Sequence, residues 1–229
     1  MKLNTSELQT QFWNEGYVII NNLIPPGFIT DWRIQIMANT TFIDNPELGI
    51  NYVKRKFDEA NLETRDSAGE YNLVSVDGRF AFNLYGLKEY YDSTANFLSL
   101  FTGLDIVESF DRQSAVTFMR YDPPAGQMVH HYDTNSLTVL LYLTDNEDGA
   151  TELWPITTHR PTTLTTPDEI VGESVKILPV TGKMVIFQGR RCWHNSSPVL
   201  KGTKISSAWN YYINGDNWRP PEVSKRLYT

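Results

Sequence analysis

Two histidines and one aspartate are the residues of this chain whose types and spacing best suit metal chemistry. One residue separates His131 from Asp133, and His194 lies much further along the chain. Residues i and i+2 of a strand point to the same side, so His131 and Asp133 can converge on one ion. Two imidazoles and one carboxylate form the facial triad that holds non-haem Fe(II) and leaves other positions open. The pattern therefore predicts an iron site, although the same ligand types also hold Zn, Mn or Ni.

Three other residues, His130, His159 and Cys192, also carry groups that could bind a metal or react. Only His131 shares the strand parity of Asp133, so His130 is not the predicted ligand. His159 falls in a segment rich in Thr and Pro, where a surface position is expected. Cys192 is the only cysteine, which excludes an intramolecular disulfide. Because no Cys–His–acid set accompanies it, we interpret Cys192 as a small buried residue and not as a nucleophile.

A cation and a phenol are expected on strands beside the triad. Lys204 begins a predicted strand over 204–212, and Tyr121 ends a predicted strand over 114–121. A lysine can pair with a carboxylate of a metal-bound ligand, and a tyrosine can donate a hydrogen bond to the same ligand. A hydrolytic zinc site has no need for a cation placed in this way. The set therefore favours a chelating dicarboxylic keto acid.

Short strands must position these side chains. From residue 106 onward the sequence predicts strands at 106–110, 114–121, 128–132, 137–144, 151–154, 175–178, 183–187, 194–196 and 204–212. Many short strands separated by turns favour a sandwich or barrel, and a jelly roll is one solution. The segment 156–174 interrupts the pattern and is expected to be an exposed insertion. The fold class predicted is mainly β with flanking helices.

The first 105 residues are expected to support this core. Helices are predicted over 6–14, from 25–26 towards 38, and over 87–100, with a strand over 17–20. The polar segment 44–77 favours a solvated loop, and a lid or substrate loop is the alternative. We predict a single domain over 1–229, with helix-rich support at 1–105, a jelly-roll core carrying the metal site at 106–213, and a tail at 214–229.

Charge and hydropathy exclude some partners. The formal net charge is −7 and the pI is about 5.1, which argues against non-specific binding of nucleic acid. The N-terminus lacks the apolar core of a signal peptide, and no run reaches the ~18–20 apolar residues of a membrane helix. We therefore expect a cytoplasmic protein that does not bind membranes. The oligomeric state is left open.

The order and spacing of the motifs resemble the Fe(II)/2-oxoglutarate-dependent oxygenases, with the prolyl-4-hydroxylase-like branch as the nearest by motif. The resemblance covers roughly 114–212. It is carried by the segments 119–122 (MRYD), 131–133 (HYD), 137–144 (LTVLLYLT), 148–155 (DGATELWP), 182–187 (GKMVIF), 193–194 (WH), 198–199 (PV), Lys204 and Trp209. The opening segment 12–20 is more similar to phytanoyl-CoA-hydroxylase-type relatives. The subfamily is therefore left open.

The resemblance implies a double-stranded β-helix, the cupin-like form of the jelly roll. It implies Fe(II) on His131, Asp133 and His194. It further implies that Lys204 binds the distal carboxylate of 2-oxoglutarate with help from Tyr121. With O2 as the second cosubstrate, the enzyme would be a 2-oxoglutarate-dependent dioxygenase that releases succinate and CO2. Because related halogenases carry Gly or Ala at the position of Asp133, hydroxylation is favoured over halogenation.

The substrate is the least determined part of the prediction. We expect hydroxylation of an unactivated C–H bond in a small metabolite, for example an amino-acid-like one. Alternatives are a peptidyl (prolyl-type) hydroxylase, a desaturase or cyclase with the same iron site, and a non-catalytic cupin-like metal-binding barrel. Arg190 and Arg191 precede His194, and either can bind a carboxylate of the substrate.

Overall fold

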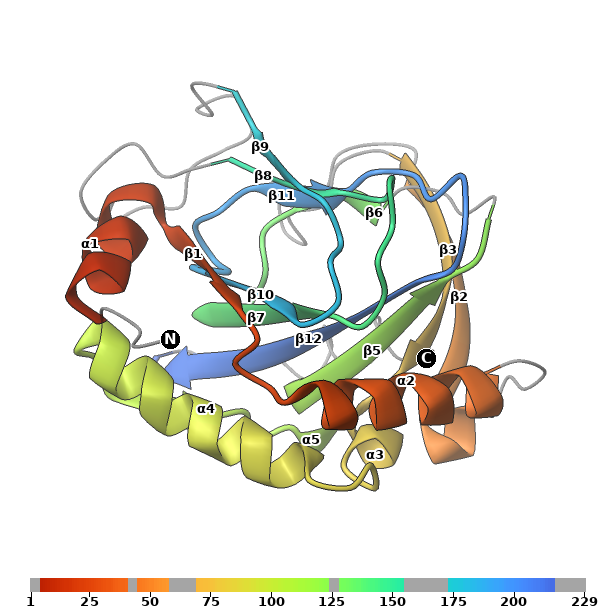
Figure 1. Cartoon of the computed structure of the whole chain (residues 1–229), viewed down its shortest axis with the longest axis horizontal. Helices are drawn as coiled ribbons and strands as arrows, with labels where there is room; N and C mark the ends of the chain where they lie inside the picture. Colours follow the sequence, from red (N-terminus) through yellow and green to blue (C-terminus); the bar gives the residue numbers. More distant parts are fainter. Residues whose placement is uncertain (1–4, 41–44, 58–68, 124–127, 155–172, 217–229) are drawn as a thin grey trace.

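The protein, described here from a computed structural model, consists of two antiparallel β-sheets that face each other (Figure 1). The structure describes residues 5–40, 45–57, 69–123, 128–154 and 173–216. Helices cover the outer side of the larger sheet, and the smaller sheet forms the opposite wall. This architecture is the jelly roll with flanking helices that the sequence predicts, so the predicted fold class is confirmed.

The larger sheet has the strand order β1-β10-β7-β12-β5-β3-β2, and β4 pairs with the free part of β12. Strands that lie side by side in this sheet come from distant parts of the sequence, which is typical of a jelly roll. The strands are β1 (Tyr17–Asn21), β2 (Ile50–Phe57), β3 (Gly69–Val76), β4 (Ile106–Glu108), β5 (Val116–Tyr121), β7 (Leu137–Tyr142), β10 (Lys183–Phe187) and β12 (Lys204–Ile213).

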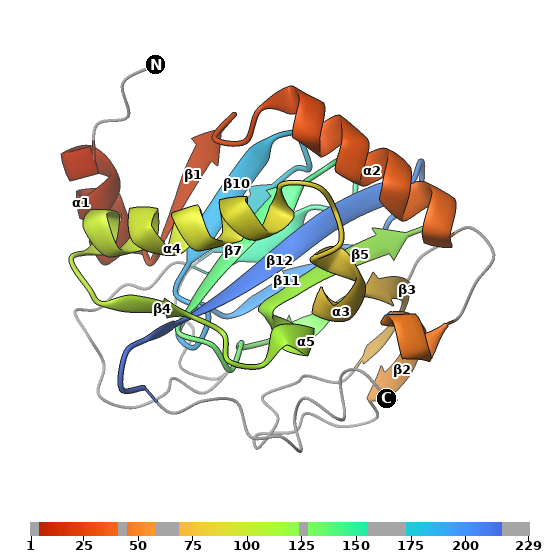
Figure 2. The same ribbon diagram turned by 90° about the horizontal axis from the view of Figure 1, so that it is seen from below.

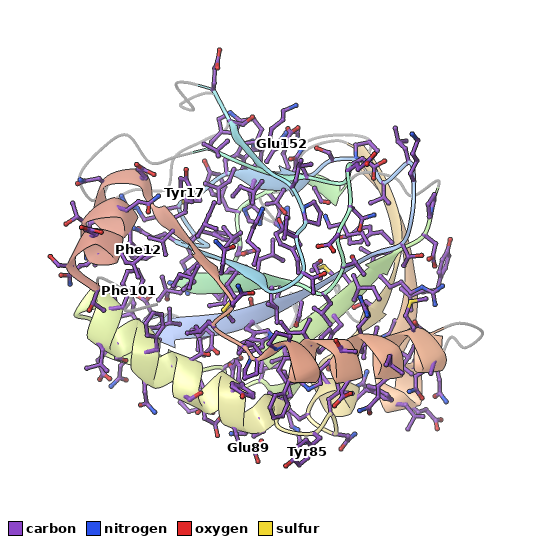
Figure 3. All side chains as sticks on the ribbon, in the orientation of Figure 1. Phe12, Tyr17, Tyr85, Glu89, Phe101 and Glu152 are labelled. Carbon is purple, nitrogen blue, oxygen red and sulfur yellow. The ribbon has the colours of Figure 1, made fainter. Side chains whose placement is uncertain are left out.

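The smaller sheet has the order β6-β11-β8-β9. Its strands are β6 (Met128–His131), β8 (Thr151–Leu153), β9 (Val175–Ile177) and β11 (His194–Ser196). Apolar side chains from both sheets meet in the barrel interior, among them Tyr142, Leu153 and Phe187. The outer side of this sheet is polar at β8, where Glu152 pairs with Lys176 of β9 (Figure 3).

A second apolar core lies between the larger sheet and the helices. The helices are α1 (Thr5–Glu15), α2 (Pro26–Thr40), α3 (Gly78–Ala81), α4 (Leu87–Thr102) and α5 (Arg112–Ala115), with a 3-10 turn at Pro46–Leu48. Figure 2 shows α2 and α4 running across the outer face of the sheet. Trp209 packs there against Trp32 and Tyr91, with ring centroids 6.4 and 6.3 Å away. Phe12 and Phe101 join α1 to α4 with centroids 5.2 Å apart (Figure 3).

The interpretation of 44–77 as a solvated loop was wrong for most of its described residues. Residues 50–57 and 69–76 pair in register as β2 and β3, and β3 pairs with β5. Their ends are held by Asp77, which is fully buried and accepts hydrogen bonds from Arg79 and Gln113. The Asp77 N–H also donates to the Gly49 carbonyl at 2.8 Å. Residues 50–57 and 69–76 are therefore part of the barrel wall.

Other boundaries differ little from prediction. The strand expected from residue 114 begins at Val116, because Asp111 caps the short helix α5 by accepting a hydrogen bond from the Gln113 N–H at 3.0 Å. The strand expected to reach residue 110 ends at Glu108. Most of the expected insertion at 156–174, including His159, lies outside the described residues. Within the described part, no helix has both the length and the apolar character needed to cross a membrane.

Candidate metal centre and cosubstrate pocket

The three predicted metal ligands come together at one end of the barrel interior. His131 ends β6, His194 begins β11, and the two residues are direct partners in the smaller sheet. Asp133 Oδ1 lies 3.4 Å from His131 Nε2 and 3.7 Å from His194 Nε2. One ligand atom from each residue falls within 4.8 Å of the other two. This spacing suits one divalent cation bound by all three side chains.

Asp133 is held in place from two sides. Its N–H donates to the Gly189 carbonyl at 2.9 Å, which ties the end of the His-x-Asp segment to the turn before β11. The Thr138 hydroxyl donates a short hydrogen bond to Asp133 Oδ2, and Asn135 Nδ2 donates to Thr138 Oγ1 at 2.7 Å. Oδ1 is therefore left to face the two imidazoles.

His194 has its ring orientation set by the backbone. Its Nδ1 lies 2.9 Å from the Cys192 carbonyl, so Nδ1 carries the proton and Nε2 presents a lone pair towards Asp133. The Phe187 ring packs edge-on against the imidazole with centroids 4.7 Å apart. Metal-binding histidines typically donate such a hydrogen bond from the ring nitrogen that does not bind the metal.

The protonation states of these groups suit a metal. Burial lowers the pKa of His194 to about 4, and nearby His131 acts in the same direction. Burial alone would raise the pKa of Asp133, but the two histidines and the Thr138 hydroxyl hold it well below its usual value. At neutral pH the site thus offers a neutral imidazole and a carboxylate, the forms that bind metal. The residues present therefore fit a divalent iron ion.

Lys204 lies deep in the barrel interior and is 1% exposed. Its Nζ donates to the Gly149 carbonyl and to Ser196 Oγ, both at 2.6 Å. The rings of Tyr121 and Tyr142 lie 5.0 and 6.0 Å from Nζ. Burial lowers the pKa of Lys204 to about 7, although the Asp148 carboxylate acts in the opposite direction. No carboxylate of the described residues lies within ion-pair distance of this ammonium.

Tyr121 lies on the same face of the larger sheet as Lys204. It is the direct cross-strand partner of Lys204 and is 1% exposed. Its hydroxyl donates to Met119 Sδ at 3.6 Å. Residues directly opposite each other in a sheet place their side chains on one face, so the pairing brings the phenol beside the ammonium.

Sequence reasoning missed Ser196, Thr138 and Tyr142. Ser196 follows His194 by two residues on β11 and therefore shares its side of the strand, a signal that was present in the sequence. Thr138 lies on β7, and only its contact with Asp133 marks it. Tyr142 lies on the interior face of β7 and donates its hydroxyl to Thr151 Oγ1 at 2.7 Å.

The two predicted substrate arginines have different surroundings. Arg190 Nε donates to the Thr134 carbonyl at 2.7 Å, and its Nη1 pairs with Asp216 Oδ2 at 3.3 Å. Its guanidinium lies 5.9 Å from the Tyr212 ring centroid. Arg191 instead donates to the Gln188 side chain at 2.7 Å. Arg190 thus adjoins the backbone that follows Asp133, whereas Arg191 braces the turn.

Two further residues lie as the sequence indicated. His130 is on the opposite face of β6 from His131, with its Nε2 3.0 Å from Asn195 Nδ2 and its ring near Trp154. Cys192 is a buried free thiol, and burial raises its pKa to about 12. A thiol with a raised pKa is a poor nucleophile, which is consistent with a packing role.

Two facing sheets with a His-Asp-His cluster and a buried lysine between them define a jelly-roll protein with a candidate metal site. Residues 116–212 match the family model described as the 2OG-Fe(II) oxygenase superfamily. This part of the chain is therefore a 2OG-Fe(II) oxygenase domain, and the protein is an enzyme of the 2-oxoglutarate-dependent class. Its cofactors are Fe(II) and 2-oxoglutarate. The family resemblance read from the sequence is confirmed.

Solved structures support the fold over nearly the whole chain. A Pseudomonas putida prolyl-4-hydroxylase is 15% identical with a TM-score of 0.58, and the match covers 91% of this chain and 98% of that one. The α-ketoglutarate-dependent epimerase SnoN from nogalamycin biosynthesis is 14% identical with a TM-score of 0.69, covering 94% and 83%. The carbocyclase SnoK from the same biosynthesis is 15% identical with a TM-score of 0.68, covering 96% and 88%. A comparison with curated protein sequences returned no match.

Proposed function

We propose that His131, Asp133 and His194 hold Fe(II), and that Lys204 binds the distal carboxylate of 2-oxoglutarate with Tyr121 beside it. The donor set and spacing of the first three residues support the metal assignment. In this proposal the single oxygenase domain predicted from the sequence hydroxylates a C–H bond of a small metabolite.

The observation that carries the proposal is the buried ammonium of Lys204. A charge in a dry interior is costly unless it is paired, and here its described partners are a carbonyl and a hydroxyl. A carboxylate that enters the pocket supplies the missing countercharge. The Ser196 hydroxyl contacts the same ammonium, and the Tyr121 ring lies 5.0 Å from it. A carboxylate has several lone pairs and can accept hydrogen bonds from both hydroxyl groups.

The protein side chains orient the reaction. When bound, iron would let O2 oxidise both 2-oxoglutarate, which leaves as succinate and CO2, and the substrate, which takes up the second oxygen atom. Asp133 and the two histidines would hold the iron, and Lys204 would bind the far carboxylate of 2-oxoglutarate, so these residues would orient both groups. Because a carboxylate occupies the position of Asp133, the site has no room for a halide ligand there, which favours hydroxylation over halogenation.

The substrate class is the finer part of the proposal. SnoN and SnoK act in nogalamycin biosynthesis, and their TM-scores exceed that of the prolyl-4-hydroxylase, which supports a small metabolite over a peptide. Peptidyl hydroxylation, desaturation and cyclisation remain alternatives with the same iron site. Arg190 is the stronger of the two substrate arginines, because it lies near Tyr212 and the segment after Asp133.

An anaerobic titration tests the proposal. Metal-free protein is titrated with Fe(II) and then 2-oxoglutarate while the visible iron-to-keto-acid charge-transfer band is recorded. We expect a band in the wild type, a weaker band in Asp133→Ala, and a need for far more 2-oxoglutarate in Lys204→Ala. Asp31→Ala and Lys201→Ala, at exposed positions, are the matched controls and should behave as the wild type.

The absence of a band, with tight binding of Zn instead, would contradict the proposal. Succinate release under O2 then distinguishes an active oxygenase from a non-catalytic metal-binding barrel, because only the oxygenase converts 2-oxoglutarate. Compounds that raise the rate of succinate release identify the substrate class.

A further inference from the structure

Asn51 and Ser75 form a polar pair at the edge of the larger sheet. Asn51 on β2 lies directly opposite Ser75 on β3, and Ser75 lies opposite Met119 on β5. The row continues from Met119 to Ser206 on β12 and from there to Tyr142 on β7. Tyr121 and Lys204 form the next inward-facing pair of β5 and β12. A single line of side chains therefore connects Asn51 with the cosubstrate pocket.

The Asn51–Ser75 pair faces the barrel interior. Ile50 and Val76 flank it in sequence, and both belong to the core on the helix side of the sheet. Alternation along a strand turns the next residue to the opposite face. Met119, which shares that face with Ser75, packs with the apolar residues of the barrel interior. β3 also lies against β6, the strand that carries His131 (Figure 1).

The Asn51 side-chain amide is buried, and its NH2 group has no hydrogen-bond acceptor among the described residues. Its residue is 8% exposed, and its Nδ2 makes no hydrogen bond with any residue that the structure describes. Buried amides are nearly always hydrogen-bonded, because an unsatisfied donor loses its hydration without compensation. An unsatisfied donor that faces a catalytic barrel therefore indicates a group that is supplied by a ligand.

The pair is held rigidly. Gly49 has φ of +81° two residues before Asn51, and a Cβ there would lie 2.2 Å from an Asp77 carboxylate oxygen. The Asp77 N–H donates to the Gly49 carbonyl, and Asp77 follows Ser75 by two residues. Because the buried Asp77 ties both strands together at this end, Asn51 and Ser75 are preorganised and do not need to be ordered by a ligand.

We infer that Asn51 and Ser75 form a substrate subsite that hydrogen-bonds a neutral polar group, such as an amide or ketone carbonyl. The inference rests on the proposed oxygenase function, because it takes the reacting part of the substrate to lie between this row and the metal ligands. An amide and a hydroxyl are uncharged, and Met119 and Leu73 beside them are apolar. A carboxylate would lose its hydration there without a countercharge, so a neutral acceptor fits better.

The test uses a simple probe in place of the unidentified substrate. Protein labelled with ¹⁵N is loaded with Zn(II), as a diamagnetic substitute for iron, and with 2-oxoglutarate. It is titrated with N-methylacetamide and, separately, with acetate. The side-chain NH2 signals of Asn51 are assigned by their loss in Asn51→Leu. We expect them to shift in a saturable way with N-methylacetamide and by a much smaller amount with acetate.

Asn83 is the matched internal control, because it is exposed and donates to the Arg79 carbonyl on the helix side. Asn51 signals that stay still, or that follow those of Asn83 with both probes, would overturn the subsite. So would a larger response to acetate. In Asn51→Leu the Ser75 backbone amide should no longer respond to N-methylacetamide, and a retained response would also count against the inference.

Stability gives a second readout. Asn51→Leu removes an unsatisfied buried amide, so we expect the Tm of the ligand-free protein to rise by a few degrees, while Asn83→Leu gives no rise. A fall in Tm for Asn51→Leu would mean that the amide has a structural partner, and the inference would fail. The charge-transfer band with Fe(II) and 2-oxoglutarate should be unchanged in this variant. Loss of that band already in the wild type would instead overturn the proposed function.

Discussion

Lys204 and Tyr121 lie directly opposite each other on β12 and β5, and the Lys204 Nζ is 5.0 Å from the centroid of the Tyr121 ring. The pairing places a cation and a phenol on the interior face of the barrel. Ser196, two residues beyond the metal-ligand candidate His194, bonds the same ammonium. The proposed binding site for 2-oxoglutarate and the candidate metal centre are thus joined by one short strand, β11.

The affinity for 2-oxoglutarate should fall as the pH rises above 7. With a pKa of about 7, Lys204 in the ligand-free protein is mostly neutral at pH 8, whereas a bound dicarboxylate requires the ammonium. Binding should therefore take up a proton, and the Kd should rise by up to about tenfold per pH unit. Calorimetry in two buffers of different ionisation enthalpy measures this uptake. Lys204→Arg stays charged, so a pH dependence that survives in this variant would contradict the assignment.

The stability of the ligand-free protein should rise between pH 7 and pH 10. The folded-state pKa of Lys204 is lowered to about 7 from about 10.4 in the unfolded chain, so the unfolded state binds more protons in this window. This one group accounts for a rise of about 3 kcal/mol between pH 7 and pH 10, and the rise is complete only above the unfolded-state pKa. Denaturant unfolding at several pH values measures the slope. Lys204→Met should flatten the dependence of stability on pH. Lys201→Met is the control and should keep the slope of the wild type.

Thr138→Val should weaken metal binding. The variant removes the hydroxyl that donates to Asp133 Oδ2, so the carboxylate loses orientation and its pKa rises. Loss of such a partner of a metal ligand typically costs about 10–100-fold in metal affinity. Competition with a chromophoric chelator measures the change. Thr138→Ser keeps the hydroxyl and should retain most of the affinity; an equal loss in both variants would argue that packing, and not the hydrogen bond, matters.

Gly189→Ala should disturb the metal site. A Cβ at this position would lie 2.8 Å from both the Asn135 carbonyl and Thr138 Oγ1, and 2.9 Å from Asp133 Cβ. The crowding should cost about 1–3 kcal/mol of stability and lower metal affinity. Gly27→Ala on α2 is the control, because nothing lies within 4 Å of its Cβ. If Gly189→Ala unfolds at the same denaturant concentration as the control, Gly189 does not lie as close to Asp133 and Thr138 as described.

Much of the core and of the site could be predicted from local pattern. The strand parity of His131 and Asp133, and the apolar run before His194, were enough to select three ligands that lie within reach of one ion. Strands 183–187 and 194–196 have the predicted bounds. These features depend on the alternation of side chains along a strand and on the residue types that bind metals. Both can be recognised in short stretches of sequence. The roles of these residues and the domain boundaries at 105 and 213 stay predictions.

The hairpin of β2 and β3 could not be predicted in this way. Its first strand contains the charged run Lys54, Arg55 and Lys56, which breaks the alternation expected of a half-buried strand. Only the pairing of β3 with β5, across more than forty residues of chain, makes the segment part of the sheet.

By itself, then, the sequence determined which chemical groups the protein offers: two imidazoles and a carboxylate at metal-binding spacing, a lysine, and the period-2 strands that carry them. The tertiary structure alone decided the partners of those groups. Segments that are distant in the chain bring Lys204 beside Tyr121 and the Gly149 carbonyl, and His131 beside His194. The physical reason is that a hydrogen bond requires atoms about 3 Å apart, and the folding of the sheets, not the local period, sets such distances.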